Sequence, residues 1–254
     1  GPHATAFPED ALMKSPIDFA VIGEGENTFL ELTKSIMENS DSQKIDGISF
    51  RTDKNIIRTK PRALISNLDE IPFPARDLID INKYPGYYVK KRKPEASFLS
   101  SRGCPYNCTY CSNIVWKTSK PWIRLRSPKN VVDEIEFLVQ KEKVKELFDQ
   151  CDEFNPNLKW SIDVCKEIIN RKIDVTWKTQ IRVDKVNEEF AENLAKSGCW
   201  LVFLGIESGN QTTLDGVRKR ISLEQAVKAS EILKRHGIKT FGLFMAFNVW
   251  EENG

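Results

Sequence analysis

The stretch that decides the fold is WLVFLGIESG, residues 200–209. Its first seven residues form the most hydrophobic run of the sequence and predict a buried strand. A helix from Asn187 to Lys196 precedes it and is stopped by Gly198. A capping box at residues 222–225, SLEQ, opens a second helix, which ends near Gly237. The strand therefore lies between two helices, as in a βα series.

The same alternation of strands and helices runs from Ala96 to Phe247. It requires right-handed crossovers and a parallel sheet. Five strands are too few for a closed eight-stranded barrel, so the sequence predicts an α/β fold built as a partial barrel or an open sheet. The strands are expected at 97–101, 144–148, 175–180, 200–206 and 239–247, and the helices begin near 127, 155, 187 and 222.

The first sixty residues have a different pattern. An apolar run at 17–23 that ends in glycine predicts a strand, and Phe29, Leu30, Thr33, Ile36 and Met37 recur at helical spacing. Residues 48–51 and 55–58 predict a hairpin. Prolines are frequent between 61 and 94, which indicates an irregular linker that wraps on a surface.

Composition excludes several classes of protein. The chain has 254 residues with 38 Lys plus Arg and 36 Asp plus Glu, a net charge of +2. That balance argues against a nucleic-acid partner, because such proteins carry a basic excess. No apolar run approaches the roughly 18 residues of a membrane span. The six cysteines are unevenly spaced in a long chain, which favours a reducing compartment, the cytoplasm, over a disulfide framework.

The most informative loop follows the first strand of the series, at residues 101–111: SRGCPYNCTYC. Cys104, Cys108 and Cys111 place three thiols within eight residues, enough to surround one soft metal or cluster. Gly103, Pro105 and Asn107 are turn formers that let the loop curl. The loop leaves the carboxyl end of its strand, where α/β folds bind ligands.

Three kinds of site compete for this loop. A structural zinc ion needs four ligands, commonly in two separated pairs, and the sequence has no second pair. A thioredoxin-like redox pair at Cys108 and Cys111 leaves Cys104 unexplained. An iron–sulfur cluster of four irons held by three thiolates leaves one iron open to a further ligand.

The spacing Cys104-x3-Cys108-x2-Cys111, with Tyr110 before the last cysteine, resembles the radical SAM superfamily. The resemblance covers residues 96–254 and implies a partial (βα)6 TIM-like barrel, truncated at its carboxyl end. It also implies a [4Fe–4S] cluster whose open iron binds S-adenosylmethionine, which is cleaved reductively to a 5′-deoxyadenosyl radical. An electron donor such as flavodoxin or ferredoxin and a small-molecule substrate would be the partners.

The resemblance also assigns cofactor-binding residues. Tyr110 would approach the adenine, and Arg182 the methionine carboxylate. Asp149 and Asp152 are the candidates for contact with the methionine amino group. Residues 205–209, GIESG, resemble a cofactor-binding element that includes Gly205. In it Glu207 accepts hydrogen bonds from the ribose, while Ser208 and Gly209 let the chain turn close to the ligand. Lys219 is expected to be a solvated charge beside a helix. No residue is assigned to catalysis itself.

Residues 1–60 resemble the last part of the doubly wound α/β cobalamin-binding domain that precedes many radical SAM domains. The stretches GPHAT at 1–5 and VIGEGE at 21–26 carry this likeness. The D-x-H-x-x-G loop that would supply the lower cobalt ligand is absent. We therefore expect three parts, a cobalamin-binding-like piece at 1–60, a linker at 61–95 and an incomplete radical SAM domain at 96–254. Cobalamin would belong to the full-length parent.

These expectations lead to a radical SAM enzyme that carries out methyl transfer or oxidative cyclisation. The alternative is a non-catalytic fragment that retains an iron–sulfur or zinc motif.

Overall fold

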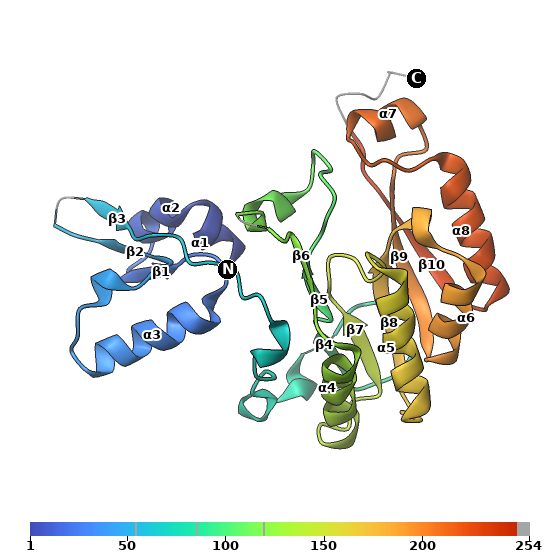
Figure 1. Cartoon of the computed structure of the whole chain (residues 1–254), viewed down its shortest axis with the longest axis horizontal. Coiled ribbons are helices and arrows are strands. Elements are labelled where there is room, and N and C mark those ends of the chain that lie inside the picture. Colours follow the sequence, from blue (N-terminus) through green and yellow to red (C-terminus); the bar gives the residue numbers. More distant parts are fainter. Residues whose placement is uncertain (54, 85, 119, 248–254) are drawn as a thin grey trace. The chain divides into compact units, whose positions relative to one another are not determined.

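The computed structural model describes residues 1–53, 55–84, 86–118 and 120–247. Its largest sheet is parallel, with strand order β10-β9-β8-β7-β4 (Figure 1). Each of these strands overlaps a stretch predicted to be one, so the five-strand parallel series is confirmed. The strands are β4 (Glu95–Phe98), β7 (Glu146–Asp149), β8 (Thr176–Ile181), β9 (Cys199–Glu207) and β10 (Lys239–Phe244).

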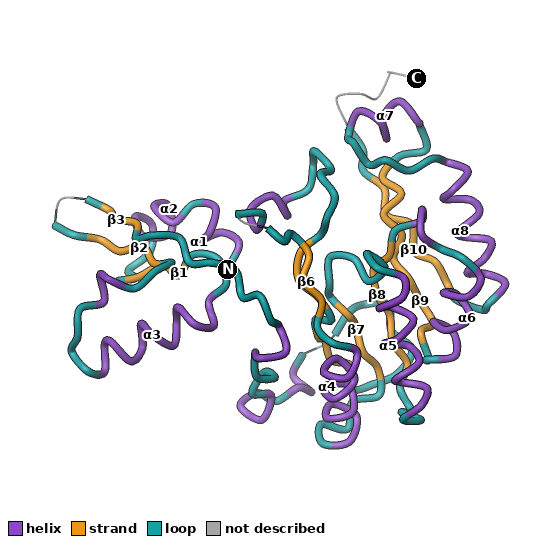
Figure 2. The backbone as a smooth tube through the Cα atoms, viewed as in Figure 1, coloured by secondary structure: helices purple, strands orange, loops and turns teal. Residues whose placement is uncertain are grey.

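Four predicted helices alternate with these strands (Figure 2). They are α4 (Pro128–Gln140), α5 (Leu158–Asn170), α6 (Glu188–Lys196) and α8 (Leu223–Arg235). The capping box of α8 is confirmed, because the Ser222 hydroxyl accepts from the Gln225 amide at 3.2 Å and the Gln225 side chain accepts from the Ser222 amide at 2.8 Å. A short helix, α7 (Gln211–Gly216), follows β9 and was not predicted from the sequence.

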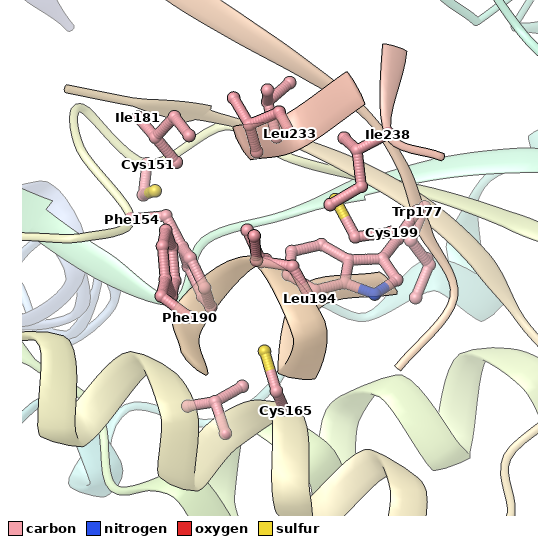
Figure 3. Close-up of a cluster of buried hydrophobic side chains, with 14 of the residues drawn as sticks. Cys151, Phe154, Cys165, Trp177, Ile181, Phe190, Leu194, Cys199, Leu233 and Ile238 are labelled. Carbon is pink, nitrogen blue, oxygen red and sulfur yellow. The ribbon is translucent and has the colours of Figure 1, made fainter. Parts of the chain in front are cut away.

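The main core lies between these helices and one face of the sheet. Figure 3 shows part of it, where Phe154 packs near Phe190 and Trp177. Cys165 and Cys199 are buried there as small core residues. The indole nitrogen of Trp177 donates to the carbonyl of Ser197 at 3.0 Å, which satisfies the polar group of this buried ring.

The opposite face of the sheet carries a second apolar cluster of Phe148, Leu201 and Phe203. Tyr87 and Val89 pack against it, with the Tyr87 ring centroid 5.3 Å from that of Phe148. Part of the segment 61–94, which the sequence predicted to be an irregular linker that wraps on a surface, therefore packs against this face of the sheet. Local composition could not reveal this, because the prolines mark irregular backbone whether or not its side chains are buried.

A buried ion triad attaches the same segment to the sheet. The Lys178 ammonium contacts Glu95 at 2.9 Å and Glu146 at 3.1 Å, and it donates to the Val89 carbonyl at 2.8 Å. Glu146 also accepts from the backbone amides of Lys91 and Arg92. All three charged side chains are almost fully buried, and such charges are tolerated inside a protein only when they are paired and hydrogen-bonded.

The chain divides into two compact units, residues 1–67 with 112–122 and residues 68–111 with 123–254. The first unit contains an antiparallel sheet in the order β1-β2-β3. The predicted hairpin and the helix near residue 29 are confirmed. Its elements are α1 (Pro2–Ala6), α2 (Pro8–Lys14), β1 (Phe19–Val21), α3 (Gly25–Met37), β2 (Ile48–Arg51) and β3 (Ile56–Arg58).

Helix α3 buries a face that its apolar spacing did not indicate. Leu32 packs against Ile48 and Phe50, whereas Phe29 and Met37 are exposed. Short 3-10 helices complete the described chain, at Ser42–Lys44, Leu68–Glu70, Arg76–Leu78, Ile81–Lys83, Ser112–Trp116 and Val183–Lys185. In the part of the chain that the structure describes, no helix has the length and apolarity to cross a membrane.

Candidate functional site

The cysteine loop begins at a short strand, β5 (Ser101–Gly103), which pairs antiparallel with β6 (Ile123–Leu125). Gly103 has a positive φ of 84°, and its amide donates to the Asp152 carboxylate at 2.9 Å. That bond anchors the start of the loop to the segment after β7. At the other end the Cys111 amide donates to the Cys108 carbonyl at 3.2 Å, which closes a turn around the last two cysteines.

The six cysteines, all among the described residues, form no disulfide, and the three in the loop are more accessible than the others. Cys104 and Cys108 are half-buried and Cys111 is exposed, whereas Cys151, Cys165 and Cys199 are buried. Among the described residues, no three His, Cys, Asp or Glu side chains are gathered closely enough to hold one metal ion. In a four-iron cluster each thiolate binds a different iron, so three cysteines on one loop, none of them in a disulfide, are a donor set that fits it.

Asp149, at the end of β7, is fully buried and makes its bonds within the protein. Its carboxylate accepts from the Ser100 amide at 3.0 Å, from the Ser100 hydroxyl, and from the Cys151 amide at 3.2 Å. Burial raises the pKa of Asp149 to about 6, even though these hydrogen bonds lower it. The side chain therefore joins the ends of β4 and β7. Its predicted contact with a cofactor stays a prediction.

Glu153 is a buried carboxylate near the loop that the sequence reasoning did not select. Its Oε2 lies 3.7 Å from the Cys104 sulfur, and its Oε1 has no hydrogen-bond partner among the described residues. The Lys185 ammonium lies 4.0 Å from Oε1. Burial raises the pKa of Glu153. The signal available in the sequence was a carboxylate at or shortly after the end of β7, but Asp149 and Asp152 share it.

Arg182 follows β8 and is buried. Its Nε donates to Asp184 at 2.9 Å, its Nη2 donates to the Lys219 carbonyl at 2.9 Å, and its guanidinium lies over the ring of Tyr106 at 3.7 Å. The residue thus connects β8 to the cysteine loop. A bond from Arg182 to a methionine carboxylate would use the remaining nitrogen, Nη1, and that role stays a prediction.

Glu207 ends β9 and has a positive φ of 69°, unusual for a residue with a side chain. It is 8% exposed, and its Oε1 accepts from the Lys219 ammonium at 2.8 Å. The Lys219 ammonium also donates to the Tyr110 hydroxyl at 3.2 Å. Burial and the negative charge of Glu207 raise the pKa of the Tyr110 phenol. The structure therefore brings two of the predicted residues, Glu207 and Tyr110, to one cation.

Lys219 is not the solvated charge that the sequence predicted. Its side chain is 9% exposed and lies between Glu207 and Tyr110. Gly205 makes room for it, since a Cβ on Gly205 would lie 2.7 Å from both the Lys219 ammonium and Glu207 Oε1. The prediction failed because charge and position beside a helix are local properties, whereas the two oxygens that bind Lys219 lie elsewhere in the sequence.

Ser208 is buried next to Glu207, and its hydroxyl accepts from the Asn210 amide at 3.1 Å. The Asn210 side chain in turn caps α7 by accepting from the Thr213 amide at 3.2 Å. These bonds turn the chain sharply after β9 and hold Glu207 at the carboxyl edge of the sheet.

Comparison with solved structures agrees with this fold. The chain superposes on the radical S-adenosylmethionine methyltransferase TsrM from Kitasatospora setae, solved with cobalamin and a [4Fe-4S] cluster, with a TM-score of 0.75 and 21% identity. It also superposes on the cobalamin-dependent S-adenosylmethionine radical enzyme OxsB, solved with aqua-cobalamin and S-adenosylmethionine, with a TM-score of 0.79 and 22% identity. The alignments cover 95% and 96% of this chain but 48% and 35% of those chains.

Curated relatives are similar over nearly the whole chain. An uncharacterized methyltransferase of Pyrococcus horikoshii is 35% identical over 96% of the chain and 52% of its own length. An anaerobic magnesium-protoporphyrin IX monomethyl ester cyclase of Rubrivivax gelatinosus is 33% identical over 96% of the chain and 44% of its own length. The chain thus spans about half the length of these relatives. The sequence model of the Radical SAM superfamily matches residues 98–252, and since this is more than half of the chain, the protein belongs to that superfamily.

Proposed function

We propose that this chain is the cofactor-binding part of a radical SAM enzyme, in which Cys104, Cys108 and Cys111 hold a [4Fe–4S] cluster beside bound S-adenosylmethionine. The observation that carries the proposal is a single loop with three cysteines, none of them in a disulfide, at the carboxyl edge of a parallel sheet. Three thiolates leave one iron without a protein ligand, where a further ligand binds. The reduced cluster would supply one electron to the sulfonium, breaking its C5′–S bond to release methionine and a 5′-deoxyadenosyl radical.

The side chains at the same edge have roles that suit this cofactor. Glu207 Oε1 is bonded to Lys219, and the second carboxylate oxygen would accept from the ribose hydroxyls. Glu153 Oε1, buried and without a hydrogen-bond partner among the described residues, suits the ammonium group of methionine. Tyr110 would approach the adenine through its backbone. Asp149 and Arg182 would contribute mainly by holding strand ends and the cysteine loop.

The reaction that follows radical formation is proposed as methyl transfer or oxidative cyclisation of a small molecule. The support is that similar proteins bear the names of methyltransferases and cyclases. For the full-length parent we propose cobalamin as a further cofactor, with residues 1–60 as the end of its domain, 61–95 as a linker and 96–254 as the radical SAM domain. Six cysteines without a disulfide suit a reducing cytoplasm, and flavodoxin or ferredoxin would donate the electron.

The test is anaerobic reconstitution of the chain with iron and sulfide. The expected result is about four irons per chain, with the optical and EPR spectra of a [4Fe–4S] cluster. Cys104→Ala should lower the iron content sharply, because it removes one of three ligands. Cys165→Ala is the matched control, since Cys165 is buried in α5 and should leave the iron content unchanged.

Under reductant the reconstituted chain should release 5′-deoxyadenosine from S-adenosylmethionine. A folded chain that stays colourless and binds no iron would reject the proposal. A chain that holds the cluster but produces no 5′-deoxyadenosine would instead support the non-catalytic alternative.

A further inference from the structure

The loop between α7 and α8, residues 217–220, has an unusual backbone. Arg218 and Arg220 have positive φ angles of 55° and 57°, which residues with side chains rarely adopt. Their side chains are exposed, while Val217 and Lys219 between them are buried. Backbone of this kind persists where surrounding contacts hold it, and it often marks a functional site. The loop thus directs the Lys219 side chain into the interior, between two arginines whose side chains are exposed.

Three contacts join this loop to the cysteine loop. The Thr109 amide donates to the Val217 carbonyl at 3.0 Å. The Lys219 ammonium donates to the Tyr110 hydroxyl at 3.2 Å. Arg182 makes the third contact, since it lies over the Tyr106 ring and donates to the Lys219 carbonyl. Residues on both sides of Cys108 are therefore held by residues 217–220, which we name the clamp loop.

The second bond of Lys219 leads to another strand end. Its ammonium contacts Glu207 Oε1 at 2.8 Å, and Gly205 leaves the space that this contact occupies. A buried ammonium requires such partners, because removing it from water is costly unless it is paired. A single cation therefore bridges the cysteine loop and the carboxylate of Glu207.

We propose that Lys219 is a positioning residue that holds the Glu207 carboxylate and the cysteine loop in fixed positions relative to each other, so that one ligand can contact both. This inference rests on the proposed function, in which S-adenosylmethionine reaches from the cluster to Glu207. A site whose two halves are joined before binding loses less freedom when the ligand arrives, and its affinity is higher for that reason.

The first experiment needs no cofactor. Hydrogen–deuterium exchange is measured on the 254-residue chain for wild type, Lys219→Met and Lys228→Met, the last an exposed lysine of α8 as control. We expect Lys219→Met to speed exchange several-fold in residues 104–111 and 205–209 and to leave α5 unchanged. Lys228→Met should match the wild type. Unchanged exchange in both segments of Lys219→Met would overturn the proposal.

A second variant guards against misfolding. Tyr110→Phe removes only one hydroxyl, and it should speed exchange in 104–111 even if Lys219→Met fails to fold. If Tyr110→Phe and Lys219→Met both fold, combining them should add little to Lys219→Met alone, because both break the same bond. Fully additive effects would count against a shared contact.

The second experiment uses the reconstituted chain and S-adenosylmethionine itself. By calorimetry, Lys219→Met should retain wild-type iron content but bind S-adenosylmethionine about tenfold more weakly, and Lys219→Arg should recover most of the affinity. Equal affinity of Lys219→Met and wild type, with the cluster present in both, would overturn the positioning role while the proposed function stands. A wild-type chain that holds no cluster and does not bind S-adenosylmethionine would reject the proposed function. The exchange experiment would still test whether Lys219 holds the cysteine loop and Glu207 together.

Discussion

The guanidinium of Arg182 lies over the ring of Tyr106, with its central carbon 3.7 Å from the ring centroid. Tyr106 is a member of the cysteine loop, between Cys104 and Cys108. Arg182, which follows β8, is 76 positions later in the sequence. The stacked and hydrogen-bonded side chain of Arg182 therefore helps to fix the conformation of the cysteine loop.

Arg182→Lys should lower the free energy of unfolding by about 2 kcal/mol, because lysine keeps the charge but loses the planar stack and the forked hydrogen bonds. Chemical denaturation of the cofactor-free chain measures this. Arg235→Lys, at an exposed position, serves as control and should be neutral. If Arg182→Lys kept full stability and lost only affinity for S-adenosylmethionine, the carboxylate-binding role would be favoured over the structural one.

The raised pKa of Asp149 predicts that the stability of the chain depends on pH. Its pKa is raised from 3.8 to about 6 in the folded chain, so the folded state holds this proton more tightly than the unfolded state. The resulting stabilisation is present below the unfolded pKa and is lost as the pH rises through about 6. A shift of about two pKa units corresponds to roughly 3 kcal/mol.

Asp149→Asn removes that titration while keeping the shape of the side chain. Relative to wild type, this variant should therefore gain stability between pH 4 and pH 7, by an amount on the order of the same 3 kcal/mol. Urea unfolding at several pH values gives the comparison. A difference between the two proteins that does not change with pH would show that Asp149 does not titrate in this range.

Lys178 should be essential for stability. Lys178→Met leaves Glu95 and Glu146 buried without their cation, and breaking a buried ion pair in this way costs about 3–5 kcal/mol. Thermal or urea unfolding should show the loss. Lys159→Met is the control, because its ion pair with Asp163 lies on the surface and should contribute nothing measurable. Similar stabilities for the two variants would contradict the assignment of the triad as a structural element.

Gly205 should not tolerate a methyl group. A Cβ there would lie 2.7 Å from both Glu207 Oε1 and Lys219 Nζ, so Gly205→Ala should separate this pair. We expect a loss of about 1–3 kcal/mol in unfolding free energy. Gly209→Ala is a matched control four residues on, where an added Cβ meets nothing within 4 Å. Equal denaturation midpoints for the two variants would mean that the pair adjusts without cost.

Much of the fold follows from local pattern. The apolar run at 200–206, the capping box at Ser222 and Gln225, and the strand–helix alternation predicted the parallel sheet and its four helices. These signals work because apolar periodicity and helix capping depend on residues within a few positions of one another. The three-cysteine spacing likewise identified the family, which the match over residues 98–252 bears out.

The pairing of the buried charged side chains was decided by tertiary structure. Lys219 meets a hydroxyl 109 positions away, and Lys178 meets Glu95 from a distance of 83 positions. The chain carries 38 lysines and arginines and 36 acidic residues, so composition alone does not pick these pairs. A charge is stable in the interior only beside a partner, and the folded chain determines which partner comes within reach. The sequence by itself thus determined the strands, helices and cysteine spacing, while the burial and pairing of charges around them came from the tertiary structure.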